Sequence, residues 1–256
     1  MAGQYTFGDG DRAAERLGLV AEIFDPLSRQ FLEDAVAPGA DLALDLGCGP
    51  GYTTRLLADV GGARRTVGLD RSEHFVDLAR RRHGSDHIGF AVHDVTAVPL
   101  PGAPADVVHA RLRLAHLPDP RGLVDRWRSQ LRPAGLLVLD EIESMTTPPG
   151  PLRRYEDLVV ALVAAEGGAM CAGPLLADLG GRCPEIDVDA ARAARMYGMN
   201  LATWRHEARR RGLAGDAELD RLAGDLAELA ELGHQAEHPT GDPVHWVLRQ
   251  IALPAR

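Results

Sequence analysis

The chain has 256 residues, of which 28 are basic and 37 acidic, and its formal net charge at pH 7 is −9. This balance argues against a non-specific nucleic-acid binder and against binding to an anionic membrane, because both need basic residues to neutralise phosphates. Three cysteines without a zinc or disulfide pattern, the lack of an 18-residue apolar run, and a start unlike a signal peptide favour a cytoplasmic protein with no membrane segment.

Short apolar runs alternate with helical patterns through the first half of the chain. Residues 11–35 carry apolar side chains at helical spacing, and we expect Pro26 to divide them into two helices. Buried strands are predicted at 42–46, 66–70, 88–93, 106–110 and 135–142, with intervening helices at 52–60, 72–82 and 120–131. Such alternation predicts a parallel sheet with right-handed crossovers.

The alternation stops after Glu143. Helical patterns follow at 152–166, 175–179 and 201–232, a strand is expected within 186–196, and Val244–Leu253 has the pattern of a final strand. The pattern therefore predicts an α/β fold with additional helices after the fifth strand.

A glycine-rich turn follows the first predicted strand, in the segment Asp45-Leu46-Gly47-Cys48-Gly49-Pro50-Gly51. Glycines at such a strand-to-helix turn let the backbone approach a ligand closely. The dinucleotide fingerprint needs a small residue where this chain has Tyr52, so a pyrophosphate ligand such as NAD is disfavoured. The alternative is a glycine turn without a ligand.

Acidic residues end the next two strands. Asp70 lies about twenty residues beyond the glycine turn, where a carboxylate suits the two hydroxyls of a ribose. Asp94 could accept a hydrogen bond from an exocyclic amine while Val95 packs on a purine ring. The alternatives are a helix N-terminal aspartate at position 70 and a turn aspartate at position 94.

These motifs, in this order, resemble the class I S-adenosylmethionine (SAM)-dependent methyltransferase family. The matching segments are LALDLGCGPG (42–51), VGLDRS (67–72), FAVHDV (90–95), DVVHARLRLAHLPDP (106–120) and LRPAGLLVLDE (131–141). The resemblance implies a Rossmann-like, seven-stranded, mostly parallel sheet flanked by helices, with S-adenosyl-L-methionine as cofactor. It leaves the substrate open, because this scaffold serves many acceptors.

The resemblance also implies a single domain over residues 1–256. We expect an N-terminal helical lid at 1–38 and a SAM-binding core at 39–143. The segment 144–256 would complete the sheet and carry helical cap insertions at about 147–182 and 200–233.

Specific cofactor contacts follow from the resemblance. Asp45 and the glycines would face the methionine part of SAM, Asp70 would bind the ribose, and Arg16 suits the methionine carboxylate. The complete set of implied cofactor-binding residues is Tyr5, Arg16, Asp45, Gly47, Cys48, Gly49, Gly51, Asp70, Arg71, Asp94, Val95 and Arg111.

Two side chains are candidates for handling the acceptor. His116 follows the fourth strand, and its reference pKa near ~6.5 suits a general base at neutral pH; the alternative is a histidine that hydrogen-bonds a neighbouring loop. Glu141 and Glu143 could orient an amine or hydroxyl acceptor, or be a solvated strand end. No metal is expected, because strand alternation would not point Asp140, Glu141 and Glu143 at one ion.

We therefore expect transfer of a methyl group to oxygen, nitrogen or carbon of a small organic acceptor in specialised metabolism, under a helical cap that Trp204 and His206 roof. His109 is expected to be a satisfied core histidine. One alternative is a protein of the same fold that uses SAM without methyl transfer, such as a cyclase. Another is a macromolecule methyltransferase. An apolar stripe on 201–232 could serve a homodimer.

Overall fold

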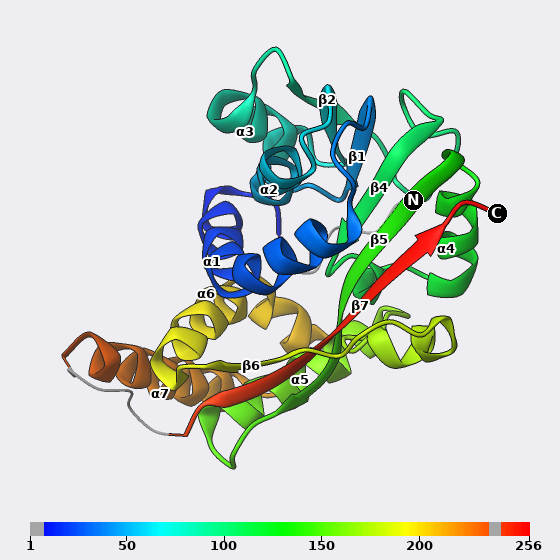
Figure 1. The fold of residues 1–256 in the computed structure, drawn as a ribbon. Coiled ribbons are helices and arrows are strands. Elements are labelled where there is room, and N and C mark those ends of the chain that lie inside the picture. Colours follow the sequence, from blue (N-terminus) through cyan, green and yellow to red (C-terminus); the bar gives the residue numbers. More distant parts are fainter. Residues whose placement is uncertain (1–7, 236–241) are drawn as a thin grey trace.

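The computed structural model describes residues 8–235 and 242–256. Its central element is a seven-stranded sheet of order β3-β2-β1-β4-β5-β7-β6, with helices on both faces (Figure 1). The strands are β1 (Leu42–Leu46), β2 (Arg65–Asp70), β3 (Ile88–Val92), β4 (Ala105–Arg111), β5 (Leu131–Thr146), β6 (Glu185–Val188) and β7 (Val244–Pro254). The helices are α1 (Asp11–Ala35), α2 (Tyr52–Gly61), α3 (Glu73–His83), α4 (Pro120–Arg128), α5 (Pro151–Ala165), α6 (Ala190–Arg210) and α7 (Asp216–Gln235), with 3-10 segments η1 (Leu114–His116) and η2 (Gly173–Leu179).

The first five strands are parallel, and β7 runs antiparallel between β5 and β6. The predicted Rossmann-like, mostly parallel sheet is therefore confirmed. Because the parallel strands end at the same edge, the loops after β1, β2 and β4 converge there, which is where ligands bind in sheets of this kind.

The helix α1 differs from its prediction, because it continues through Pro26 as one helix. Proline removes one backbone hydrogen bond from a helix interior. Burial on both sides of Pro26 opposes this cost: Ile23 and Phe24 pack before it, and Phe31 and Leu32 after it. Tertiary packing of an amphipathic face thus overrides the local break.

The C-terminal helices also differ from their prediction. The segment expected as one helix from residue 201 is two helices, α6 and α7, separated by a turn in which Gly212 has φ of 70°. Helix α6 begins at Ala190, because Asp189 caps it by accepting hydrogen bonds from the backbone N–H groups of Ala191 and Arg192. The strand expected within 186–196 is confined to β6.

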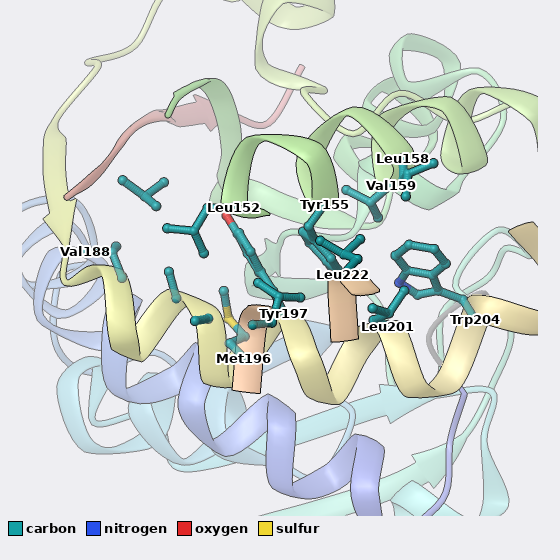
Figure 2. Packing of buried hydrophobic residues seen from close by; sticks show 14 of the residues in the cluster. Leu152, Tyr155, Leu158, Val159, Val188, Met196, Tyr197, Leu201, Trp204 and Leu222 are labelled. Atoms are coloured by element: carbon teal, nitrogen blue, oxygen red, sulfur yellow. The ribbon is translucent and has the colours of Figure 1, made fainter. Parts of the chain in front are cut away.

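Helices α5, α6 and α7 lie at the carboxyl end of β5 (Figure 1). Figure 2 shows their interior, where Tyr155 of α5 lies beside Tyr197 of α6, with Trp204 and Leu222 close by. The apolar stripe of α7 points into this cluster, since Leu219, Leu222 and Leu226 are buried. None of the helices in the described part of the chain is long and apolar enough to cross a membrane.

Candidate active site

A cavity of about 410 Å³ opens where the carboxyl ends of β1, β2 and β4 meet α1, α5 and α6. One side of its lining comes from the loops that follow the parallel strands, and the other from β5, β7 and the C-terminal helices. The cavity therefore joins the predicted cofactor loops to a second, largely apolar wall.

The glycine turn requires backbone conformations that other residues rarely adopt. Gly47, Gly49 and Gly51 have φ of 74°, 50° and 94°. Gly47 and Gly49 line the cavity, with Cys48 between them. Gly51 does not: it precedes α2, and a β-carbon there would stand 3.0 Å from atoms of Ala79, His83 and Phe90. The first two glycines shape the cavity, and the third lets α2 pack closely on its neighbours.

Asp70 links the glycine turn to the start of α3. Its carboxylate accepts hydrogen bonds from the backbone N–H groups of Gly49, at 3.0 Å, and Ser72, at 2.9 Å. The side chain is buried yet lines the cavity, as Arg71 does beside it. Each carboxylate oxygen has two lone pairs, so Asp70 retains capacity to accept hydroxyl donors from a ligand.

Asp45 lies elsewhere than expected, because it is not among the residues that line the cavity. Its carboxylate accepts hydrogen bonds from the hydroxyls of Thr53 and Thr54, at 2.6 and 2.7 Å, and lies 2.9 Å from Nδ1 of His109. Burial raises the pKa of Asp45, but these hydrogen bonds and the His109 charge outweigh it and lower the pKa overall. Asp45 thus connects β1, β4 and α2 internally, and His109 is a core histidine.

The pair after β3 also lies outside the cavity lining. Asp94 is exposed and accepts hydrogen bonds from the backbone and the hydroxyl of Thr96, as in a turn. Val95 is buried in the core, and its carbonyl accepts a hydrogen bond from Trp127 Nε1. Burial raises the pKa of Asp94, but Asp94 is close enough to the cavity-lining Arg113 and Arg71 for their charges, together with the Thr96 hydrogen bonds, to lower the pKa overall. The contacts of Asp94 and Val95 with an adenine stay a prediction. Tyr5 lies outside the described residues.

The end of β4 carries two arginines that diverge. Arg111 lines the cavity but pairs with Asp25 on α1, at 2.7 Å. The chain then reverses at Leu112, whose φ is 51°, and Arg113 lies over the glycine turn: a β-carbon on Gly47 would stand 2.5 Å from its Cδ. Sequence reasoning named Arg111 and missed Arg113. If the strand continued through residue 113, its alternation would place the two arginine side chains on the same face of the sheet. The sequence therefore contains no sign that they have different partners.

Glu141 is buried at the junction of the two walls. Its Oε1 accepts hydrogen bonds from the backbone N–H groups of Arg113 and Leu114, both at 2.8 Å. Its Oε2 has no hydrogen-bond partner among the described residues. Burial raises the pKa of Glu141 to about 8, against the two backbone hydrogen bonds, which lower it. A buried carboxyl oriented in this way is equipped to meet a cation or a hydrogen-bond donor in the cavity.

His116 lines the same cavity from η1, beside a cluster of arginines. Burial and the nearby charges of Arg113, Arg16 and Arg71 lower its pKa to about 3. The imidazole is therefore neutral at neutral pH but far less basic than a free histidine. Arg16 is buried and lines the cavity. Its contact with the methionine carboxylate stays a prediction.

The neighbouring carboxylates point in different directions. Asp140 accepts a hydrogen bond from Ser28, at 2.5 Å, and Glu143 pairs with Arg249, at 2.6 Å. Neither lines the cavity, so Glu143 is not placed to orient an acceptor. The expected roof is also different: Trp204 is fully buried in the core and His206 is exposed, whereas Asn200 of α6 reaches the cavity.

A parallel sheet of this order, with a glycine turn after β1 and a carboxylate ending β2, defines a Rossmann-like protein whose ligand site lies at the carboxyl ends of the strands. Comparison with known proteins makes the class specific. Residues 44–139 match the model of a family described as methyltransferase domain. Residues 44–139, which run from β1 into β5, thus resemble a methyltransferase domain of the class I SAM-dependent family.

Curated relatives agree with this assignment. The trans-aconitate 2-methyltransferase of Rhizobium rhizogenes is 32% identical over 57% of this chain and 52% of its own length. The demethylmenaquinone methyltransferase of Clavibacter sepedonicus is 36% identical over 55% of this chain and 56% of its own length. The chain thus spans about half the length of these relatives.

Solved structures share the fold over most of the chain. YcgJ of Bacillus subtilis has a TM-score of 0.54 at 15% identity, covering 95% of this chain and 99% of that protein. The [4+2]-cyclase SpnF has a TM-score of 0.50 at 19% identity, covering 89% and 80%. At these identities the likeness concerns the fold.

The residues at the cavity fit S-adenosyl-L-methionine, the cofactor of this family. Gly47 and Gly49 bring the backbone of the turn to the cavity, and Asp70 offers a carboxylate suited to a ribose. Glu141 lines the cavity with a buried oxygen that has no hydrogen-bond partner among the described residues. The chemistry of these donors and acceptors matches a nucleoside joined to an amino acid.

Proposed function

We propose that this protein transfers the methyl group of SAM to oxygen, nitrogen or carbon of a small organic acceptor in specialised metabolism. The observation that carries the proposal is the continuity of one cavity, which runs from the glycine turn to the apolar wall of α5, α6 and β7. A concave, largely apolar site with a few converging polar groups is typical of small-molecule binding.

In this proposal the loops after β1 and β2 bind the cofactor. Gly47, Cys48 and Gly49 line the cofactor site. Asp70 accepts hydrogen bonds from the ribose hydroxyls, and Arg71 lies beside the ribose. SAM supplies an electrophilic methyl group on a positively charged sulfur. The chain's own contribution is to bring two reactants into line and to exclude water, which Arg16 of α1 assists by closing the cavity.

Glu141 is the better candidate than His116 for handling an acceptor proton. A carboxyl whose pKa is about 8 exchanges a proton near neutral pH, whereas an imidazole whose pKa is about 3 holds one poorly. We therefore assign His116 the role of a neutral hydrogen-bonding group in the cavity wall. Glu141 orients the acceptor and, once it is ionised, accepts a proton from it.

The first test is calorimetric titration with S-adenosylhomocysteine, with NAD as the control ligand. The proposal expects binding of the former alone, and an affinity about tenfold or more lower in Asp70→Ala. Asp59→Asn, an exposed change on α2, is the matched control and should leave the affinity unchanged. Lack of binding by S-adenosylhomocysteine would overturn the assignment of the cavity.

The second candidate is a protein that binds SAM without transferring its methyl group, such as a cyclase. It needs the same cofactor loops, so binding does not separate the two. Transfer of an isotope-labelled methyl group to a panel of small acceptors does. A basic outer face would instead favour a macromolecular acceptor, which the net charge of −9 opposes.

A further inference from the structure

The part of the cavity wall formed by residues from the end of β5 onward differs in charge from the part formed by the loops after β1, β2 and β4. The arginines that line the cavity, Arg16, Arg71, Arg111 and Arg113, all precede residue 114. Among the lining residues beyond Ile142, Glu156 is the single one with a charged side chain. The C-terminal wall, defined here as the described lining residues from Met145 to Trp246, therefore has acidic character, and none of these described residues is basic.

Aromatic rings dominate this wall. The rings of Tyr155 and Tyr197 are stacked, with centroids 4.0 Å apart and an interplanar angle of 13° (Figure 2). Trp246 of β7 lies against Phe24 of α1, with centroids 5.0 Å apart. All four side chains line the cavity. Stacked and tilted rings of this kind offer apolar surface and the electron-rich faces that attract cations.

Glu156 is fixed among these rings. It is 4% exposed, and its Oε1 accepts hydrogen bonds from the hydroxyls of Thr147 and Tyr197, both at 2.7 Å. No hydrogen bond to its Oε2 is found in the described part of the chain, and the side chain lines the cavity. Two hydroxyl donors on one oxygen orient the carboxyl and stabilise its negative charge.

Among the described residues, Glu156 forms no salt bridge. Arg153 acts on it from the same helix, but Arg153 is paired with Asp157 at the exposed face. Burial raises the pKa of Glu156, against the hydrogen bonds from Thr147 and Tyr197, as expected for a carboxylate that lacks a neighbouring cation. A positively charged group on a ligand would supply a cationic partner for the Glu156 carboxylate.

We infer that the C-terminal wall binds the acceptor, and that Glu156, with the surrounding rings, selects a ring-containing organic amine in its protonated form. This inference rests on the proposed function. A protonated nitrogen has no lone pair to receive a methyl group, so the amine held by Glu156 is a recognition group and the methylated atom lies elsewhere on the acceptor. Glu156 is thus a specificity-determining residue.

An anionic acceptor fits this wall poorly. A carboxylate placed among the C-terminal residues would face Glu156 without a basic side chain from the same wall, and two like charges at close range repel. The inference therefore separates this chain from an enzyme acting on a polycarboxylate, the class named for its trans-aconitate relatives.

The test compares three probes that share a phenyl ring and a two-carbon arm: 2-phenylethylamine, 2-phenylethanol and 3-phenylpropanoate. Each is titrated at millimolar concentration into the full chain, with and without S-adenosylhomocysteine, and followed by saturation-transfer NMR. The inference expects the amine to bind about tenfold more tightly than the other two, and expects this preference to vanish in Glu156→Gln. Glutamine keeps an acceptor oxygen for Thr147 and Tyr197, so the fold should persist, and thermal unfolding checks this.

The matched control is Asp157→Asn, which removes the same charge one residue further on at the exposed face and should keep the amine preference. Tighter binding of the alcohol or the carboxylate, equal binding of all three, or no binding of the amine would overturn the inference. Failure of the proposed function has a different signature, namely loss of S-adenosylhomocysteine binding in the unaltered protein.

Discussion

The side chain of Arg113 covers Gly47 so closely that a β-carbon on the glycine would stand 2.5 Å from Cδ of the arginine. The glycine turn after β1 and the loop after β4 are thereby fitted to each other across the cavity. Because the φ of Gly47 is 74°, a side chain at this position would be strained as well as crowded.

Gly47→Ala should weaken binding of S-adenosylhomocysteine about tenfold or more, since the turn or Arg113 must shift. Gly62→Ala is the control: its φ is 54°, but a β-carbon there meets no atom within 4 Å. It should cost about 1 kcal/mol of stability and leave affinity unchanged. In a protein that already carries Arg113→Ala, the loss of affinity caused by Gly47→Ala should be smaller. An equal loss of affinity with and without Arg113→Ala would show that the approach of Arg113 to Gly47 does not affect binding.

Glu141 should make the protein less stable as the pH rises. Its pKa is raised from 4.5 to about 8, so the folded state holds a proton that the unfolded state has lost between these values, and the free energy of unfolding falls across that window. Glu141→Gln should remove this loss, with a gain relative to the unaltered chain of a few kcal/mol, on the order of what burial of a charge costs. Urea unfolding at pH 5 and pH 8.5 measures it.

The exposed change Glu33→Gln serves as the control for Glu141→Gln and should show the same small effect at both pH values. If the difference between Glu141→Gln and the unaltered chain were also the same at pH 5 and pH 8.5, the carboxyl would not be protonated in the folded state.

His116 should contribute to acid lability. Its pKa is lowered from 6.5 to about 3, so the unfolded state binds a proton between these values that the folded state does not, and stability falls as the pH drops through that range. In the NMR spectrum the His116 imidazole should stay neutral from pH 8 to pH 5. The His116→Asn variant should lose less stability than the unaltered protein between pH 7 and pH 5. A titration of His116 centred near its reference pKa would contradict this.

Asp45 should stabilise the fold and not merely the ligand site. Asp45→Asn weakens the network with Thr53, Thr54 and His109, and we expect a loss of about 1–3 kcal/mol at pH 7 in urea unfolding. Because the pKa of Asp45 is lowered below 3.8, the stability it provides is present above that value and is lost as the pH falls through the folded pKa. The penalty of the substitution should therefore shrink in acid. A penalty unchanged down to pH 3 would argue against an ionised Asp45.

Replacing Pro26 should stabilise α1. The residue is exposed, so Pro26→Ala sacrifices little packing while it restores a backbone donor in the helix interior. We expect a gain of about 1 kcal/mol and a higher melting temperature. The control Gln30→Ala changes another exposed position of the same helix, where the backbone donor is already present, and should have a smaller effect. A destabilised Pro26→Ala variant would mean that the proline sets a bend on which the packing of Phe24 and Phe31 depends.

Local patterns predicted the part of the chain from β1 to β5 well, because each element there is set by nearby residues. Apolar runs short enough to be strands precede turn residues, and Ser72 caps α3 by accepting a hydrogen bond from the Phe75 backbone, as its position in the sequence indicates. Helix boundaries beyond β5 were less predictable. Tertiary burial carries α1 through Pro26. The start of α6 at Ala190 depends on the Asp189 cap, a local signal that the prediction of a strand within 186–196 overlooked.

The sequence by itself determined the parallel sheet, the glycine turn and the place of Asp70, because strand alternation and glycine conformations act over a few residues. Only the tertiary structure decided which polar side chains face the cavity. Asp45 and Asp94 turn to neighbouring hydroxyls, whereas Glu141 and Glu156 are buried against it. The physical reason is that the position of a side chain relative to the cavity depends on contacts between elements distant in the chain, such as those of Asp45 with His109 and of Glu141 with Arg113.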